Sequence, residues 1–86
     1  MPTLPVARMG DLTLVFQDVI TDGSPDVFVN NLPVARMLDP VSGTSVLIVS
    51  GSMSVFVNGL PIARMTDPTL TDVIGPDVSL DVFAGG

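Results

Sequence analysis

Short runs of apolar and β-branched residues alternate with turn-forming residues along the whole chain. Segments such as VFVN and LPVARM carry no helical period, and Gly, Pro, Asn and Ser interrupt the apolar positions every few residues. Prolines recur from one end to the other and leave no uninterrupted amphipathic helical window. The pattern predicts an all-β fold with little or no helix, in which residues 69–73 are the one place for a single helical turn.

Two β-hairpins are predicted where two apolar segments are joined by a pair of turn-forming residues. Asn58-Gly59 is the strongest short hairpin signal, because a type I′ turn needs a positive φ at both central positions. Asn30-Asn31 holds the same place in the earlier hairpin. Phe56 then faces Pro61 in a non-hydrogen-bonded pair, where the proline removes no bond between the two strands. A further turn is expected at residues 50–52.

An internal repeat organises the sequence. LPVARM occurs at residues 4–9 and again at 32–37, and LPIARM at 60–65, with a spacing of 28 residues both times. Between residues 23–40 and 51–68, 13 of 18 positions are identical, so these two segments are copies of one unit.

The half-unit that is missing before the first LPVARM stands at the other end of the chain. The closing DVSLDVFAGG repeats the VFVN lead-in, and joining it to the first residues completes a third unit. An open solenoid would add capping repeats with polar outer faces, and none is visible. We therefore expect one domain over residues 1–86, with units of roughly 75–86 plus 1–22, 23–50 and 51–74. These units would be related by pseudo-threefold symmetry, with Met1 close to Gly86.

The composition excludes several classes of function. The chain has no His and no Cys, which removes the commonest metal ligands and the usual general base. We expect no catalytic residue, no metal and no cofactor. A net charge of −6 with three basic residues gives no positive field for nucleic acid. Charged residues are only 14% of the chain, so part of its surface is expected to lie against a partner.

The three arginines recur in the three repeats, each placed three residues before an aspartate. The pairs are Arg8 with Asp11, Arg36 with Asp39 and Arg64 with Asp67. Each guanidinium is expected to satisfy nearby carbonyls or its aspartate and to lock the strand end. The alternative is a ring of arginines that docks on an acidic partner.

The repeated methionines and phenylalanines are expected to fill the core, with the Pro, Ala and Met face of LPVARM turned inward. These residues are Met9, Met37, Met65, Phe28, Phe56 and Phe83. The remaining aspartates supply oxygens that suit hard cations, although in turns such residues normally accept local backbone hydrogen bonds. They are Asp18, Asp22, Asp26, Asp72, Asp77 and Asp81. They leave open an alternative function as a free cation- or ligand-binding β-repeat module.

The segment VFVNGLPIARMTDP and its sister copies resemble the PAAR-repeat family over essentially the whole chain. PVAR and PIAR stand where the family has its Pro-Ala-Ala-Arg signature. The resemblance implies a small conical fold on the blunt end of a trimeric β-helical spike, in a type VI secretion system or a contractile phage tail. It implies a structural tip protein, monomeric by itself, bound at one chain per spike trimer and in transient contact with a target membrane. Its place would be a virion tail baseplate or an injection-machine spike tip, reached from the cytoplasm because no signal peptide is visible.

The sequence departs from the family at the apex. Family members typically hold a metal ion there with His and Cys, placed a few residues after the repeat aspartate. In this chain Val15, Thr44 and Thr71 lie near those positions. We expect hydroxyls and apolar side chains to fill the tip, with no transition metal bound.

Overall fold

Six two-residue strands form three separate antiparallel pairs in a computed structural model that describes residues 3–85. The strands are β1 (Leu4–Pro5), β2 (Phe28–Val29), β3 (Leu32–Pro33), β4 (Phe56–Val57), β5 (Leu60–Pro61) and β6 (Phe83–Ala84). β2 pairs with β3, β4 with β5, and β6 with β1. The all-β class is therefore confirmed.

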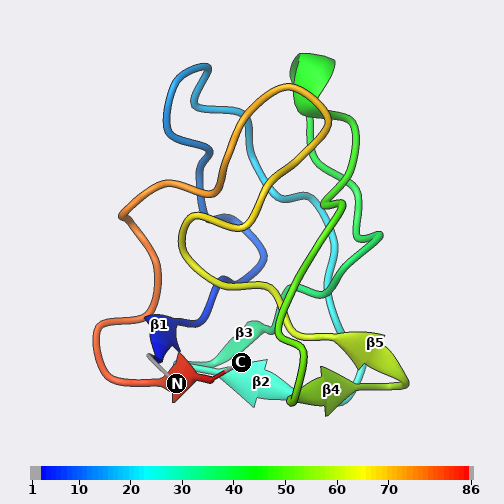
Figure 1. The fold of residues 1–86 in the computed structure, drawn as a ribbon, viewed down its shortest axis with the longest axis vertical. Coiled ribbons are helices and arrows are strands. Elements are labelled where there is room, and N and C mark those ends of the chain that lie inside the picture. Colours follow the sequence, from blue (N-terminus) through cyan, green and yellow to red (C-terminus); the bar gives the residue numbers. More distant parts are fainter. Residues whose placement is uncertain (1–2, 86) are drawn as a thin grey trace.

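The strands and the loops lie at opposite ends of the molecule. Figure 1 shows the three strand pairs together at one end of the molecule, which we call the base. Three loops reach the other end, which we call the apex, and they comprise residues 12–19, 40–47 and 68–73. The two ends therefore present different surfaces to a partner.

Both hairpin turns have the predicted backbone. The central residues Asn58 and Gly59 have φ of 54° and 79°, and Asn30 and Asn31 have 54° and 66°. Such values match a type I′ turn, whose twist suits the flanking strands. Phe56 lies opposite Pro61, so the predicted register is confirmed.

The two ends of the chain supply the third strand pair. Leu4 lies opposite Ala84 and Pro5 opposite Phe83, in the register of the two hairpins. The expected contact of Met1 with Gly86 lies outside the described residues. The pairing of β1 with β6 nevertheless brings the described ends of the chain together.

Main-chain hydrogen bonds between the three LP(V/I)ARM segments run in a closed cycle. The amide of Ala7 donates to Ala63, that of Ala35 to Ala7, and that of Ala63 to Ala35, with N–O distances of 3.0, 3.0 and 2.9 Å. A second cycle, at 2.8 Å, joins Met9 to Pro33, Met37 to Pro61 and Met65 to Pro5. Each segment is thus bonded to both others.

These segments separate two small cores. On the base side, valines and their equivalents pack together, namely Val6, Val29, Val34, Val57, Ile62 and Ala84. On the apical side lie Ala7, Ile20, Ala35, Val41, Ile48, Ala63, Ile74 and Val78. Successive side chains of an extended segment point to opposite faces, so each repeat contributes to both cores. The prediction of one inward face was wrong, and of the methionines only Met65 packs against a core, while partly exposed.

The one helical turn within residues 3–85 is a 3₁₀ turn at Gly43–Ser45 and does not fall in residues 69–73 as predicted. The bridge between Pro68 and Val73 closes a short loop, whereas the bridge between Pro40 and Leu47 encloses two more residues. The third loop is therefore two residues shorter than the second loop, in which the turn forms. No helix within residues 3–85 has the length and apolarity that crossing a membrane would require.

The turn expected at residues 50–52 is not a hairpin. Ile48 forms an isolated bridge with Thr69, so the apolar run before Gly51 does not pair with the segment after it. Gly51 instead passes close to β5 of its own unit, where an added Cβ would lie 2.6 Å from the carbonyl oxygen of Ile62. The glycine marks a close approach of two backbones.

Candidate functional site: the base and the apex

Each repeat holds its arginine and aspartate as a bidentate pair. Arg36 donates from Nε to Oδ2 of Asp39 at 3.0 Å and from Nη2 to Oδ1 at 2.8 Å. The main-chain amide of Arg36 also donates to Oδ2, at 2.7 Å. The hydrogen bond with Asp39 raises the pKa of Arg36 above its ordinary value. Arg8 with Asp11 and Arg64 with Asp67 make the same contacts.

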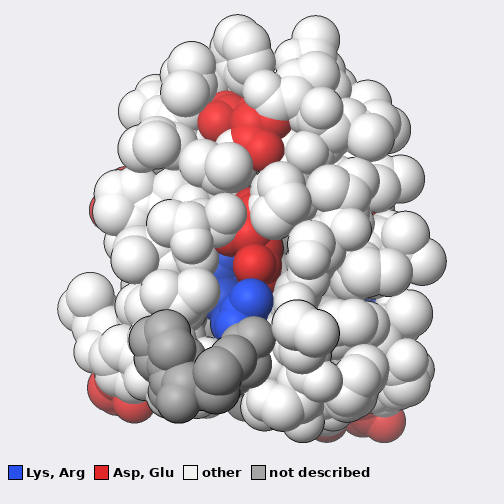
Figure 2. Space-filling model, in the orientation of Figure 1, with Lys and Arg blue, Asp and Glu red and all other residues white. Residues whose placement is uncertain are grey.

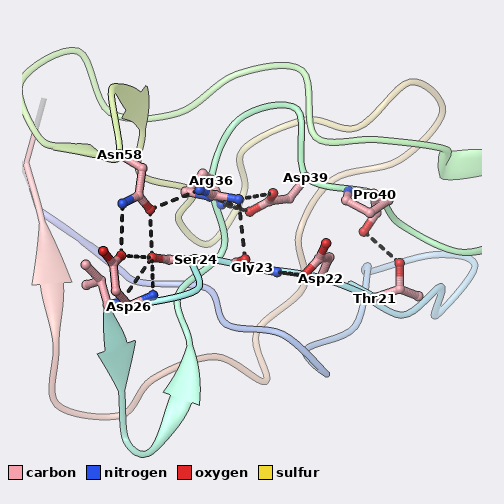
Figure 3. Close-up of polar contacts among 10 residues, drawn as sticks. Thr21, Asp22, Gly23, Ser24, Asp26, Arg36, Asp39, Pro40 and Asn58 are labelled. Carbon is pink, nitrogen blue, oxygen red and sulfur yellow. Dashed lines mark hydrogen bonds and ion pairs between the residues drawn. The ribbon is translucent and has the colours of Figure 1, made fainter.

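The arginines are poorly placed for docking. Their side chains keep only 16, 14 and 9% of their exposure, in the order Arg8, Arg36 and Arg64. The remaining nitrogen of the Arg36 fork donates to the side-chain oxygen of Asn58 at 3.0 Å, and Ser24 donates to the same oxygen at 2.7 Å (Figure 3). These contacts favour the structural interpretation over a docking ring.

Three phenylalanines project from the base and leave the core to their neighbours. Phe28, Phe56 and Phe83 are 57, 56 and 53% exposed, so the expectation that they fill the core was wrong. Each begins a two-residue strand whose second residue is buried, and alternation turns the first side chain outward. Met53 and Leu80, which lie three residues earlier in their units, are 82 and 92% exposed. The base thus carries large apolar side chains from all three units.

Most of the aspartates that could have served a cation site accept hydrogen bonds from other groups of the protein instead. Within residues 3–85 no three carboxylates gather at a spacing that could hold a metal ion. Asp22 accepts from the amide of Gly23 at 2.8 Å, and Asp81 from the side chain of Asn30 at 2.9 Å. Figure 2 shows one column of acidic and cationic atoms on a face that is otherwise largely uncharged. This arrangement gives no support to the alternative of a cation-binding module.

The three predicted tip residues come from the three apical loops. The hydroxyl of Thr71 donates to that of Thr44 at 3.3 Å, and the amide of Val15 donates to the carboxylate of Asp72 at 3.1 Å. Two hydroxyls that bond each other and one valine do not fit zinc or iron, and the chain has no His or Cys to replace them. The three loops also expose apolar side chains, namely Leu14, Val15, Phe16, Val46 and Leu70.

The sequence repeat does not reveal two groups of residues. Hydrophobicity alone could not distinguish the exposed Phe28, Phe56 and Phe83 from core residues. Asp18 and Asp72 bind backbone amides of neighbouring loops, as described below, but the second loop has no equivalent carboxylate. A feature present in two of three units gives no threefold signal in the sequence.

Three separate strand pairs, closed cycles of main-chain hydrogen bonds, repeated Arg–Asp pairs and an apolar base define a small β-repeat protein. A family model described as the PAAR motif matches residues 17–72. Because this match spans more than half of the chain, the protein belongs to the PAAR-motif family. Members of the family are structural proteins at the spike tips of contractile injection machines. Among curated proteins, none matches the chain significantly.

Proposed function

We propose that this protein caps and sharpens the trimeric β-helical spike of a contractile injection machine, with its base on the spike and its apex leading. The observation that carries the proposal is the set of three half-exposed phenylalanines at the base, one from each unit. Large apolar patches on a small protein mark interaction surfaces. Aromatic side chains, Phe among them, are also enriched at protein interfaces.

The number of units favours one cap per trimer. A trimer presents three identical surfaces around its axis, and a single chain with three equivalent strand pairs can contact all of them without breaking the closure. Three separate caps could not share one axis. The protein itself is a monomer in this proposal, with units of roughly 75–86 plus 1–22, 23–50 and 51–74.

The proposed role is mechanical, without catalysis. The three arginine forks are engaged by aspartates, and the sequence has no Lys, His or Cys to activate a nucleophile. The closed hydrogen-bond cycle through Ala7, Ala35 and Ala63 ties the units into one body that can transmit axial force. The exposed apolar residues of the apex would then meet the target envelope first. The location is the tip of a phage tail spike or of a related injection machine.

Size-exclusion chromatography with light scattering tests this function. The protein is mixed in excess with its cognate trimeric spike, and the mass of the eluting complex is measured. We expect the mass of the trimer plus one chain of 8.9 kDa. A complex with three chains per trimer, or separate elution of the two proteins, would contradict the cap.

A further inference from the structure

We propose that the carboxylates of Asp18 and Asp72 hold the three apical loops together, in the place where a metal ion would otherwise join them. Closure of the tip does not depend on what the base binds. The apical residues do not fit a metal site, and hydrogen bonds connect each pair of apical loops directly.

Asp72 joins the third loop to the first. Its Oδ2 atom accepts hydrogen bonds from the amides of Phe16 at 2.8 Å and Val15 at 3.1 Å. Its Oδ1 atom accepts from the amide of the next residue, Val73, at 2.8 Å. One carboxylate therefore satisfies main-chain donors of two loops at once, and charged acceptors make the stronger hydrogen bonds of this kind.

Asp18 joins the first loop to the second. Its Oδ2 atom accepts from the hydroxyl of Ser45 at 2.8 Å and from the amide of the same residue at 3.3 Å. Ser45 is fully buried, so its polar groups depend on protein partners. Gly43 makes room for this contact, because a Cβ at that position would collide with the carboxylate of Asp18.

The second and third loops are joined without a carboxylate. The amide of Leu70 donates to the carbonyl of Ser45 at 3.2 Å, and the hydroxyls of Thr71 and Thr44 are in contact. Val46 stands two residues before Ile48, in the place that Asp18 holds before Ile20 and Asp72 before Ile74. With this third link, every loop is tied to both others.

The two carboxylates are the only titratable groups in the apical loops, which contain no Lys, Arg or His. Partial burial acts to raise the pKa of Asp72, and hydrogen bonds from the amides of Phe16 and Val73, the Thr13 hydroxyl and the Val15 amide outweigh it. The pKa of Asp72 therefore lies below its ordinary value. A lowered pKa means that the stabilisation is complete above the ordinary carboxyl range and is lost as the pH falls through the lower value.

Nuclear magnetic resonance and thermal melts test the inference on the whole chain. In the unmodified protein, the amide protons of Val15 and Phe16 should titrate with a midpoint below about pH 4, the ordinary aspartate value. Asp72→Asn should abolish that titration and speed hydrogen exchange at Phe16 by about tenfold, the loss expected for one hydrogen bond. Asp18→Asn should likewise speed hydrogen exchange at the amide of Ser45.

Asp77→Asn is the matched control, because the exposed carboxylate of Asp77 accepts no hydrogen bond within residues 3–85. It should leave both amides and the melting temperature unchanged, whereas the two apical variants should melt several degrees lower. A chelator should leave the melting temperature of the unmodified protein unchanged. The inference is overturned if Val15 and Phe16 do not titrate in the unmodified protein, if Asp72→Asn leaves them protected, or if a chelator destabilises the tip.

Discussion

The side-chain amide of Asn58 donates to the carboxylate of Asp26, with 2.9 Å between Nδ2 and Oδ1 (Figure 3). Asn58 lies in the turn of one hairpin, and Asp26 lies in the lead-in to the other, so the bond ties neighbouring units together. Asn30 makes the same bond to Asp81, also at 2.9 Å. Two of the three junctions between units therefore use the same hydrogen bond, from an asparagine amide to an aspartate carboxylate.

The third junction, between Gly85 and the unit that holds Ser52 and Arg64, uses a substitute. Gly85 stands in the place of the asparagine, and its main-chain carbonyl accepts from Arg64 at 3.0 Å and from the hydroxyl of Ser52. Ser54 replaces the aspartate that the missing amide would have bonded. The sequence thus loses the aspartate at the one junction that has no asparagine, which indicates that the two residues act as a pair.

Asn58→Gly should destabilise the protein by about 1–2 kcal/mol, because it removes the oxygen that accepts from Arg36 and the amide that donates to Asp26. Glycine avoids adding strain at the positive φ of this turn. Asn31→Gly is the matched control, since its side chain makes no hydrogen bond within residues 3–85 and Gly59 holds the equivalent place. Urea unfolding measures both. Equal losses in the two variants would show that the Asn58 side chain contributes nothing specific.

Acid should weaken the junctions between units. The Asn58 amide and then the Ser24 hydroxyl lower the pKa of Asp26, and Asn30 and Ser79 act in the same order on Asp81. A carboxyl whose pKa is lowered by folding stabilises the folded state above its ordinary pKa and loses this contribution as the pH falls.

Melting temperatures of the unmodified protein and of Asn58→Gly, recorded from about pH 7 down to about pH 3, should therefore converge in acid. The unmodified protein loses the contribution of Asp26 on acidification, whereas the variant has already lost most of it. A difference between the two proteins that stays constant over this range would contradict the assignment.

The hairpins and the closure through the chain ends were predictable because they depend on local chemistry that repeats. Asn58-Gly59 specifies its turn by backbone preference alone, and the split repeat requires β6 to meet β1. The bidentate Arg–Asp pairs follow from a constant spacing of three residues. Such features need no knowledge of the distant packing.

The direction of Phe56 and the closure of the apex could not be predicted in this way. An apolar residue in a two-residue strand can face the core or a partner, and only the buried Val57 beside it decides which. The apical loops differ in length and in sequence, so their links through Asp72 and Asp18 are not copies of one another. The repeat therefore predicts the strand pairs of the base, whereas the apical loops are held by contacts that differ from one loop to the next.

Leu38→Gly should stabilise the protein by about 0.5–1 kcal/mol. Gly10, Leu38 and Thr66 hold the same turn position with φ of 93°, 78° and 72°, a region in which L side chains are strained. Leu38 is 54% exposed, so little packing is lost with its side chain. Leu80→Gly is the control, because Leu80 is more exposed but has no positive φ, and glycine there should only add unfolded-state entropy. If Leu38→Gly unfolds at lower urea than the unmodified protein, the strain assignment is wrong.

Calorimetric titration of two phenylalanine variants against the cognate trimeric spike tests the cap most directly. Phe56 at the base and Phe16 at the apex are each 56% exposed, so their alanine variants are matched in residue type and exposure. Phe56→Ala should weaken binding at least tenfold, about 1.4 kcal/mol, while Phe16→Ala leaves it unchanged. Binding should keep a stoichiometry of one chain per trimer and depend little on salt, because apolar burial is not screened. Loss of binding with Phe16→Ala alone would show that the apex, and not the base, docks on the spike. An affinity that falls steeply as salt rises, together with weak binding of Arg36→Ala, would assign docking to the arginines instead.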